Sequence, residues 1–269
     1  MQISVTGGRT LTATLFRHED KDGTIEVLQE SAGVRTLRFG TASKQSSVDP
    51  DEPHRLILPY TRILTAGLLF RADPRRVLLL GLGGGALAHF FLHHFPDCTV
   101  TAVESWPRVV AVARDYFDLP VDDPRLKVRL ADARSFLTDP AEVPDGGWDL
   151  VIVDTYAPEG PAPGTTDRSF YTLCRAGMAP GGVLAAHLWS SHRRILRHAL
   201  AALRTEMEPP AYSLQARGRA NVAALAGPGG LPEPSDPGLA RRAAALEAAT
   251  DLAYRQYLAD LQPVRRGWL

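Results

Sequence analysis

Val77-Leu78-Leu79-Leu80-Gly81-Leu82-Gly83-Gly84-Gly85-Ala86 is the stretch that decides the fold class of this 269-residue chain. Four consecutive aliphatic residues are typical of a strand that is covered on both faces, and the glycines after them predict a tight turn into a helix. Such a turn lets the backbone approach a ligand closely and directs helix N-terminal amides at its polar groups. The stretch also fits a loose G-x-G-x-x-A pattern, which is weak evidence for a nucleotide site on its own.

Short aliphatic runs alternate with amphipathic segments from this stretch onward. We expect strands at 77–80, 100–103, 126–130, 150–153 and 183–188, and helices at 86–94, 109–117, 133–138 and 170–178. Repeated β-α-β units predict an α/β fold with a doubly wound, mostly parallel sheet. A helix over 193–207, a terminal antiparallel hairpin of 211–214 with 221–225, and a long helix over 239–261 complete the expected order.

The N-terminal residues follow a different pattern. Short β-type runs at 11–16, 25–30 and 36–39 are separated by turn residues, which predicts a small antiparallel β domain. The proline-rich segment 49–53 then interrupts the chain, and 56–70 has apolar residues at helical spacing. We therefore expect a β domain over 1–53 and a nucleotide-binding domain over 54–269.

Composition and charge exclude several classes of function. Thirty basic residues balance thirty acidic ones, so we expect neither a nucleic acid nor a membrane surface as partner. Cys98 and Cys174 are too few for a disulfide framework, and the first 17 residues lack the features of a signal peptide. These observations predict a cytoplasmic protein.

Acidic residues follow the predicted strands where a doubly wound sheet binds ligands. Glu104 comes directly after the second strand, 19 residues beyond Gly85, at the spacing expected for a carboxylate that accepts from ribose hydroxyls. Asp132 follows the third strand and could accept from an adenine amino group or cap the next helix. Asp154 follows the fourth strand. For Glu104 the alternative is also a solvated helix cap, but the series is more specific than any one member.

This series resembles the spermidine synthase family, the polyamine aminopropyltransferases, from about residue 25 to residue 188. The resemblance implies the class I S-adenosylmethionine-dependent methyltransferase fold with a small N-terminal β domain, and a homodimer or homotetramer. It implies a donor, S-adenosylmethionine or its decarboxylated form, and a small-molecule acceptor. The residues that it places at the donor are Gln29, Gln45, Gly81, Gly83, Gly84, Gly85, Glu104, Asp132, Ala133 and Asp154.

Two departures from the family pattern concern the charge of the substrates. Gly84 stands where the family has the aspartate of its G-G-G-D-G-G loop, and Ala157 stands where a second aspartate would bind the amine acceptor. Desolvating an ammonium without a paired charge costs several kcal/mol. A diamine should therefore bind poorly unless Glu159 or Glu52 substitutes, and ordinary S-adenosylmethionine with methyl transfer becomes a credible alternative to aminopropyl transfer.

The resemblance also supplies candidates for catalysis. Either transfer is a displacement at a carbon bound to a sulfonium, in which the protein positions and deprotonates the nucleophile. We expect Asp154 to orient or deprotonate the nucleophile and Tyr60 to act as the gate over the acceptor pocket. Tyr156 and Trp189 are expected to line that pocket. His187 could serve as a base or be only a packed polar residue.

Other functions remain open at this point. Gly81, Gly83, Ala86 and Glu104 also fit the fingerprint of a nicotinamide-dependent oxidoreductase. A sensor or scaffold that binds the nucleotide without chemistry is a second alternative. A metal site is not expected, because His89, His93 and His94 lie at helical spacing with no accompanying cysteine or carboxylate set.

Overall fold

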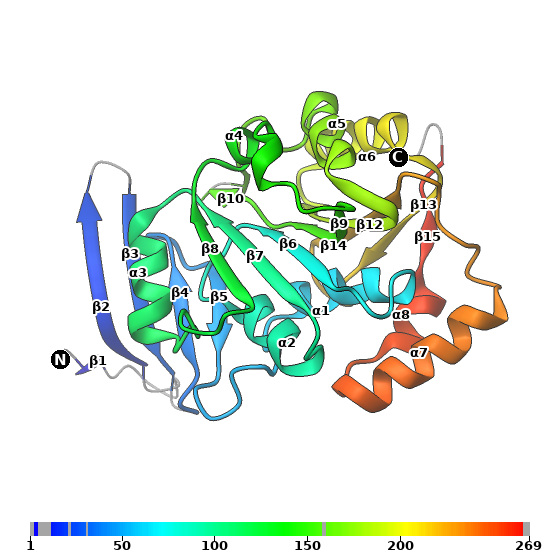
Figure 1. The fold of residues 1–269 in the computed structure, drawn as a ribbon. Helices are drawn as coiled ribbons and strands as arrows, with labels where there is room; N and C mark the ends of the chain where they lie inside the picture. Colours follow the sequence, from blue (N-terminus) through cyan, green and yellow to red (C-terminus); the bar gives the residue numbers. More distant parts are fainter. Residues whose placement is uncertain (1–2, 5–11, 21–22, 31, 158–159, 266–269) are drawn as a thin grey trace.

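Two large sheets organise the chain (Figure 1). The computed structural model describes residues 3–4, 12–20, 23–30, 32–157 and 160–265. The N-terminal sheet has the strand order β1-β2-β3-β4-β5 and is antiparallel throughout. Its strands are β1 (Ile3–Ser4), β2 (Thr12–Asp20), β3 (Gly23–Gln29), β4 (Arg35–Arg38) and β5 (Lys44–Val48).

The second sheet is the mostly parallel one that the sequence predicts. Its strand order is β15-β13-β14-β12-β9-β6-β7-β8, and the five strands from β12 to β8 are parallel. Its strands are β6 (Arg76–Leu80), β7 (Thr99–Glu104), β8 (Leu126–Leu130), β9 (Trp148–Val153), β12 (Met178–Trp189), β13 (Glu208–Gln215), β14 (Asn221–Gly227) and β15 (Gln262–Pro263). The predicted terminal hairpin is confirmed as β13 and β14, which pair in antiparallel fashion. β10 (Tyr156–Ala157) and β11 (Gly160–Pro161) form a small hairpin beyond β9.

Helices cover both faces of this sheet, and each face has its own core. Along β6 the side chains alternate, because Val77 and Leu79 pack into one cluster while Leu78 and Leu80 pack into the other. The first cluster takes in α1 (Pro59–Leu64), α2 (Ala86–His94), α3 (Pro107–Tyr116), α7 (Pro237–Thr250) and α8 (Tyr254–Asp260). The second takes in α4 (Ala133–Leu137), α5 (Arg168–Ala176) and α6 (Arg193–Glu206), which lie above the sheet in Figure 1. This arrangement explains the near-continuous aliphatic runs.

Two of the predicted helices are broken in the structure. The expected helix over 239–261 is divided into α7 and α8, because Asp251 takes a left-handed conformation (φ 58°) and ends α7. The expected helix over 56–70 is α1 followed directly by the 3₁₀ helix η1 (Thr65–Leu69). A second 3₁₀ helix, η2, spans Pro140–Glu142. The prediction of one long C-terminal helix was therefore wrong.

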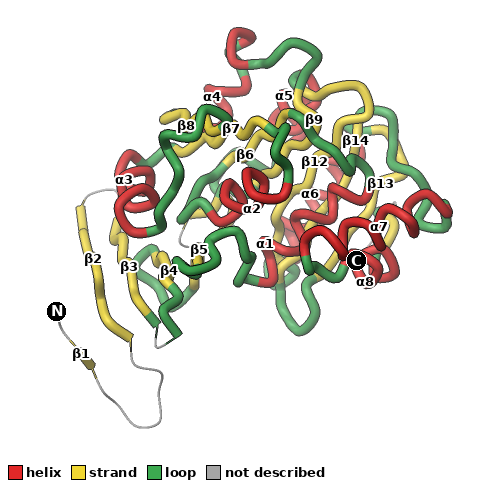
Figure 2. Tube along the Cα trace, turned by 60° about the horizontal axis from the view of Figure 1, so that its bottom comes forward, coloured by secondary structure: helices red, strands yellow, loops and turns green. Residues whose placement is uncertain are grey.

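The C-terminal helices pack against η1, which follows α1 directly. Tyr254 of α8 donates through Oη to Oγ1 of Thr65 at 2.9 Å, and Arg242 of α7 donates to the carbonyl of Leu69 at 2.6 Å. Figure 2 shows α7 and α8 together at the side of the molecule that also carries α1. Residues far apart in the chain thus support the segment that carries Tyr60.

The N-terminal sheet contacts the second sheet's helical layer through α3. Arg35 of β4 donates to the carbonyl of Tyr116 at 2.6 Å, and Phe16 packs on the Tyr116 ring with centroids 5.5 Å apart. The boundary at residue 53 stays a prediction. Within the described residues, no helix is both long and apolar enough to cross a membrane.

Candidate functional site

The site is a crevice at the carboxyl ends of β6, β7, β8, β9 and β12, covered on one side by β5 and α1. We call it the crevice. Residues that line it include Gln45, Tyr60, Gly81, Glu104, Asp154 and His187. Carboxyl ends of parallel strands are where doubly wound folds bind ligands. We call the part over β6 to β8 the nucleotide half, because the sequence predicts a nucleotide there, and the part over β9 and β12 the aromatic half.

The glycine turn after β6 is required by close backbone contact. Gly81 has φ 102°, and a Cβ there would lie 2.3 Å from the carbonyl oxygen of Asp154. Gly83 also has a positive φ, of 55°. Only glycine fits at residue 81 for both reasons. The turn at Gly81 therefore lies directly against the residue that follows β9, which brings Asp154 to the nucleotide half.

Glu104 holds the turn from the neighbouring strand. Its Oε2 accepts from the backbone N–H of Leu82 at 3.2 Å and its Oε1 accepts from that of Trp106 at 2.9 Å. Burial raises the pKa of Glu104, although these backbone donors oppose the shift. A carboxylate in this place lines the crevice and has further lone pairs for a vicinal diol.

Asp132 caps a helix and lines the crevice as well. It is the N-cap of α4, and its Oδ1 accepts from the backbone N–H groups of Arg134 and Ser135, both at 3.0 Å. Its Oδ2 accepts from no described residue. The two roles considered for Asp132 are therefore compatible, because one oxygen serves the cap and the other is available to a ligand. Ala133 lies beside it in the crevice wall.

The cover of the nucleotide half comes from the N-terminal sheet. Gln45 of β5 lines the crevice, as does Lys44, whose Nζ binds the carboxylate of Glu30. Phe39 packs on Trp106 with ring centroids 5.2 Å apart, and both rings line the crevice. Lys44, Phe39 and Trp106 are crevice residues that the sequence analysis did not identify. The edge strand β5 and the rings of Phe39 and Trp106 thus cover the nucleotide half.

Three of the predicted donor residues do not line the crevice. Gln29 is exposed on β3, so the expectation that it lies near the donor is not met. Gly84 faces away, because a Cβ there would lie 2.9 Å from Phe117 and 3.0 Å from Oγ of Ser46. Gly85, with φ 80°, is the N-cap of α2. Gly84 and Gly85 therefore shape the turn without forming the wall.

The aromatic half is built around a pair formed by Asp154 and His187. Nδ1 of His187 and Oδ1 of Asp154 are 2.8 Å apart, and Nε2 of His187 is 2.9 Å from Nδ2 of Asn221. The Asn221 amide donates to Nε2, so the neutral imidazole carries its proton on Nδ1 and donates to Asp154. Both ring nitrogens are thereby engaged. The geometry thus favours His187 as a residue that positions Asp154, and it gives no support to His187 as a base.

Aromatic rings surround the pair. Tyr60 stacks on His187 with centroids 4.5 Å apart and an interplanar angle of 3°, and its Oη donates to the Gln45 carbonyl at 2.5 Å. Tyr156 lies 4.5 Å from the His187 ring and 5.0 Å from that of Trp189. All four rings line the crevice. Such a wall suits an ammonium group or its neutral amine, because aromatic faces attract cations.

The hydroxyl groups of Tyr60 and Tyr156 are strongly held in their neutral form. Burial raises the pKa of each well above its ordinary value, and the negative charge of Asp154 adds to the shift. Neither tyrosine is therefore a base near neutral pH. Asp154 is the remaining carboxylate of the aromatic half among the described residues.

Among the described residues, no acid replaces the missing family aspartates in the aromatic half of the crevice. Glu52 is exposed and pairs with Arg55 at 2.9 Å, outside the crevice. Ala157 lies in β10 and lines the wall with its methyl group. The other candidate, Glu159, lies outside the described residues. The described part of the wall thus has no second carboxylate beside Asp154 in the aromatic half.

The histidines of α2 do not form the single face that the sequence suggests. His89 points inward, is buried, and its Nε2 lies 2.9 Å from the carbonyl of Phe117. His93 and His94 instead meet His54, which lies in the loop before α1. The sequence analysis did not identify His54 as a neighbour of His93 and His94, because His54 is distant from them in sequence.

Comparisons with known proteins identify the family of the chain. Residues 59–205, more than half of the chain, match the spermine/spermidine synthase domain. The chain belongs to this family. It is 30% identical to a polyamine aminopropyltransferase of Neisseria meningitidis over 90% of the chain and 91% of the relative.

Solved structures agree on the fold of this synthase-family chain. A probable spermidine synthase from Corynebacterium glutamicum has a TM-score of 0.72 at 21% identity, covering 94% of this chain and 96% of that one. Human methyltransferase-like protein 13 has a TM-score of 0.60 at 24% identity, covering 79% and 96%. The predicted fold class is confirmed.

Family membership settles the broad class of function. The chain is a spermidine-synthase-like transferase. The alternative of a nicotinamide-dependent oxidoreductase, which rested on Gly81, Gly83, Ala86 and Glu104, is overturned by the family match. Those residues are shared by both classes of nucleotide site, so the glycine pattern alone could not distinguish them.

Proposed function

We propose that the protein transfers an alkyl group from the sulfonium of an S-adenosyl donor to the nitrogen of a small amine. The observation that carries this proposal is the Asp154 carboxylate, which is held by His187 where the nucleotide half meets the aromatic half. The carbon–sulfur bond breaks and its electron pair leaves with sulfur. The carbon–nitrogen bond forms, and the proton of the nitrogen passes to Asp154.

In this proposal the nucleotide half holds the donor by its adenosine. Glu104 accepts from the two ribose hydroxyls, and the free oxygen of Asp132 accepts from the adenine amino group. Gln45 contacts the same ligand from the cover, and the backbone of Gly81 to Gly83 approaches its sulfonium end. The sulfonium then lies beside Asp154, since the turn at Gly81 is in contact with the Asp154 backbone.

The aromatic half would bind the acceptor. Tyr60, Tyr156 and Trp189 provide faces for an amine, and the Asp154 carboxylate takes its proton. His187 acts through Asp154, because both of its nitrogens are already bonded. A site of this kind favours a monoamine, since no described carboxylate is available for a second ammonium group.

Two donors fit this reaction, and different observations favour them. The polyamine aminopropyltransferase relative favours decarboxylated S-adenosylmethionine and aminopropyl transfer. The departure from the family pattern at residue 84 is the reason to keep S-adenosylmethionine and methyl transfer as the second donor and reaction. The structure adds no support for them, because a Cβ at this residue would point at Phe117 and Ser46.

The test begins with the melting temperature of the protein in the presence of S-adenosylhomocysteine, methylthioadenosine, decarboxylated S-adenosylmethionine and NAD at equal concentration. A ligand at 100 times its Kd stabilises the folded state by about 2.7 kcal/mol. Mass spectrometry of products from a panel of mono- and diamines then distinguishes methyl from aminopropyl transfer. Binding without any product in the whole panel would favour the sensor alternative over the proposed reaction.

The remaining predictions concern assembly and location. We expect a homodimer or homotetramer in the cytoplasm, as the family resemblance suggests. Sedimentation that shows only a monomer at micromolar concentration would contradict the first expectation.

A further inference from the structure

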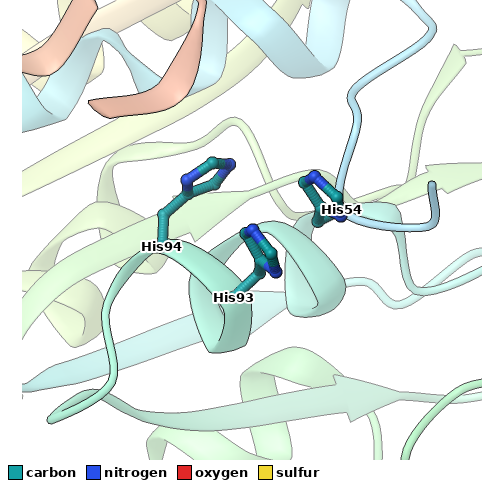
Figure 3. A group of neighbouring side chains, drawn as sticks. All are labelled: His54, His93 and His94. Carbon is teal, nitrogen blue, oxygen red and sulfur yellow. The ribbon is translucent and has the colours of Figure 1, made fainter. Parts of the chain in front are cut away.

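Three histidines that the proposed reaction does not use meet on the surface beside α2 (Figure 3). His93 and His94 are the last two residues of α2, and His54 lies in the loop between β5 and α1. One ring nitrogen of each lies within 4.8 Å of one from each of the others. We call this group the histidine cluster. None of its members lines the crevice.

The rings are close but not arranged as a simple packed stack. His54 and His93 are stacked with centroids 3.6 Å apart, whereas His94 meets each of them edge-on, at 5.5 Å from His54 and 4.7 Å from His93. His54 and His94 are half-buried and His93 is exposed. Three imidazoles thus converge from two segments of the chain, and the third side of the cluster is open to solvent.

The cluster has the properties of a nitrogen ligand set. Burial, followed by the neighbouring imidazoles, lowers the pKa of His94 to about 4, and burial with His93 lowers the pKa of His54. The backbone of Ala249 in α7 is within hydrogen-bonding reach of the His94 ring. A backbone carbonyl that accepts from one ring nitrogen fixes the tautomer and leaves the other nitrogen with its lone pair.

The charged groups near the histidine cluster bond to one another, and no described hydrogen bond joins them to the histidine rings. Glu52 and Arg55 are the ionised neighbours of His54, and they pair with each other at 2.9 Å. Arg55 also binds Asp49 at 2.5 Å. Within the part of the chain that the structure describes, the three imidazoles therefore face one another with no carboxylate bonded to them, as ligands of a metal ion would.

We propose that His54, His93 and His94 bind one divalent late transition-metal ion, of which Zn²⁺ is the natural probe, with water completing the coordination. Imidazole nitrogens suit zinc, copper, nickel and cobalt. In a tetrahedral zinc site the nitrogens lie about 3.4 Å apart, since each Zn–N bond is about 2.0–2.1 Å. The ring of His93 must turn out of its stack, because a lone pair lies in the ring plane. As an exposed residue at a helix end, it has room to do so.

An ion at this place would join two segments that bound the crevice. The loop with His54 connects β5, which carries Gln45, to α1, which carries Tyr60. α2 begins at the glycine turn and ends at His93 and His94. The metal would therefore hold the cover of the crevice to the helix that follows the nucleotide turn. This is a structural role, independent of which group the enzyme transfers.

The test uses full-length protein without a histidine tag, freed of metal with a chelator. Zn²⁺ is titrated at neutral pH by calorimetry, and Co²⁺ is used to observe the visible absorption that distinguishes tetrahedral from octahedral ligation. We expect one ion per chain, a higher melting temperature with Zn²⁺, and a loss of affinity of at least about 100-fold in H54A and H93A.

The matched control is H198A, which removes an exposed histidine of α6 and should bind Zn²⁺ like the parent protein. Retained binding of S-adenosylhomocysteine and an unchanged melting temperature without metal show that H93A is folded. The proposal is overturned if the parent protein shows no saturable binding of Zn²⁺ or Co²⁺. Equal affinity in H93A and the parent protein would also overturn it, as would an equal loss in H198A.

Discussion

Tyr60 and His187 lie face to face in the aromatic half of the crevice, with ring centroids 4.5 Å apart and planes within 3° of parallel. Tyr60 comes from α1 and His187 from β12, so the stack fixes the helix that closes the crevice against the sheet that carries Asp154. The Tyr60 hydroxyl extends this link to the N-terminal sheet through the Gln45 carbonyl. Tyr60 thus connects the cover of the crevice to the histidine that holds Asp154.

The stack and the hydroxyl of Tyr60 should be separable by mutation. Tyr60→Phe keeps the ring and removes one hydrogen bond, so we expect a loss of about 1 kcal/mol of stability and a kcat within several-fold of the parent. Tyr60→Leu also removes the stack and should raise KM for the acceptor further. Steady-state kinetics on both variants checks this, and a Tyr60→Phe variant without activity would show that the hydroxyl takes part in the chemistry.

Asp154 and His187 should differ in what their loss does. Asp154→Asn removes the proton acceptor, so kcat should fall by about 10²–10⁴ while S-adenosylhomocysteine binds with a similar Kd. His187→Gln retains a donor toward Asp154 and should lower kcat less, by about 10-fold. Kinetics with calorimetry of the donor analogue separates the two. Equal losses of kcat would mean that His187 itself takes the proton.

Glu104 should govern donor affinity. Glu104→Gln removes a charged acceptor for the ribose hydroxyls, and hydrogen bonds to charged groups contribute about 1.5–3 kcal/mol each. We expect the Kd of S-adenosylhomocysteine to rise by about 10- to 100-fold, with kcat at saturating donor less affected. Binding should also weaken as pH falls, beginning above the usual range of a carboxyl because the pKa of Glu104 is raised. A pH-independent Kd between neutral pH and pH 5 would argue against ribose recognition by this carboxylate.

Gly84 should not accept a side chain. A Cβ at this residue would lie 2.9 Å from the Phe117 ring and 3.0 Å from Ser46, so Gly84→Ala should cost about 1–3 kcal/mol of stability. Gly229→Ala is the control, because nothing lies within 4 Å of a Cβ there. Thermal unfolding of both variants measures the difference. If Gly84→Ala is as stable as its control, the contacts with Phe117 and Ser46 do not restrict residue 84 to glycine.

Asp149 should make stability depend on pH. Its carboxylate is fully buried and accepts from Arg71 and from the backbone N–H groups of Arg75 and Arg76. Burial alone would raise its pKa, but these donors outweigh burial and lower it below 3.8. A carboxyl with a depressed folded pKa stabilises the protein above its unfolded pKa, and this contribution is lost as pH falls through the folded pKa.

The matching variant is Asp149→Asn. Its deficit in unfolding free energy should be constant above about pH 5 and shrink below about pH 4, where Asp149 of the unfolded parent chain becomes protonated. The shrinkage ends once the folded carboxyl is protonated as well. Denaturant unfolding at several pH values measures this deficit. A deficit that grows toward acid would reverse the sign of the argument.

The parallel sheet was predicted well because most of its strands contain a short aliphatic run. Residues 77–80 lie in a strand with both faces buried. Glu104 is the last residue of its strand and Asp154 directly follows its own, and these strand ends meet at one edge of the sheet. Sequence patterns did not predict an element whose residues lack aliphatic periodicity, or a helix end without a typical helix-ending residue. β5 is polar along Lys44–Val48, and Asp251 ends α7 without a glycine or proline.

The residues of the candidate site could be predicted only where they follow such a local pattern. Glu104 and Asp154 could be predicted because they lie at the ends of strands. Asn221 meets His187 only because β14 pairs with β12, and this pairing has no sequence pattern. His54 likewise meets His93 and His94 through a loop that no periodicity describes. Residues that meet through antiparallel strand pairing or through a loop have no regular spacing in the sequence, so sequence patterns cannot predict their contacts.

The hydrogen bond between Tyr254 and Thr65 has a consequence for how the protein is made. These residues are 189 positions apart, and the later one supports the segment directly after Tyr60. A ribosome that has released residues up to about 230 has delivered every strand from β6 to β14, so the nucleotide half can already form. The segment that carries Tyr60 lacks the support of α7 and α8 until these helices emerge from the ribosome. A nascent chain should therefore bind nucleoside before it can hold an acceptor.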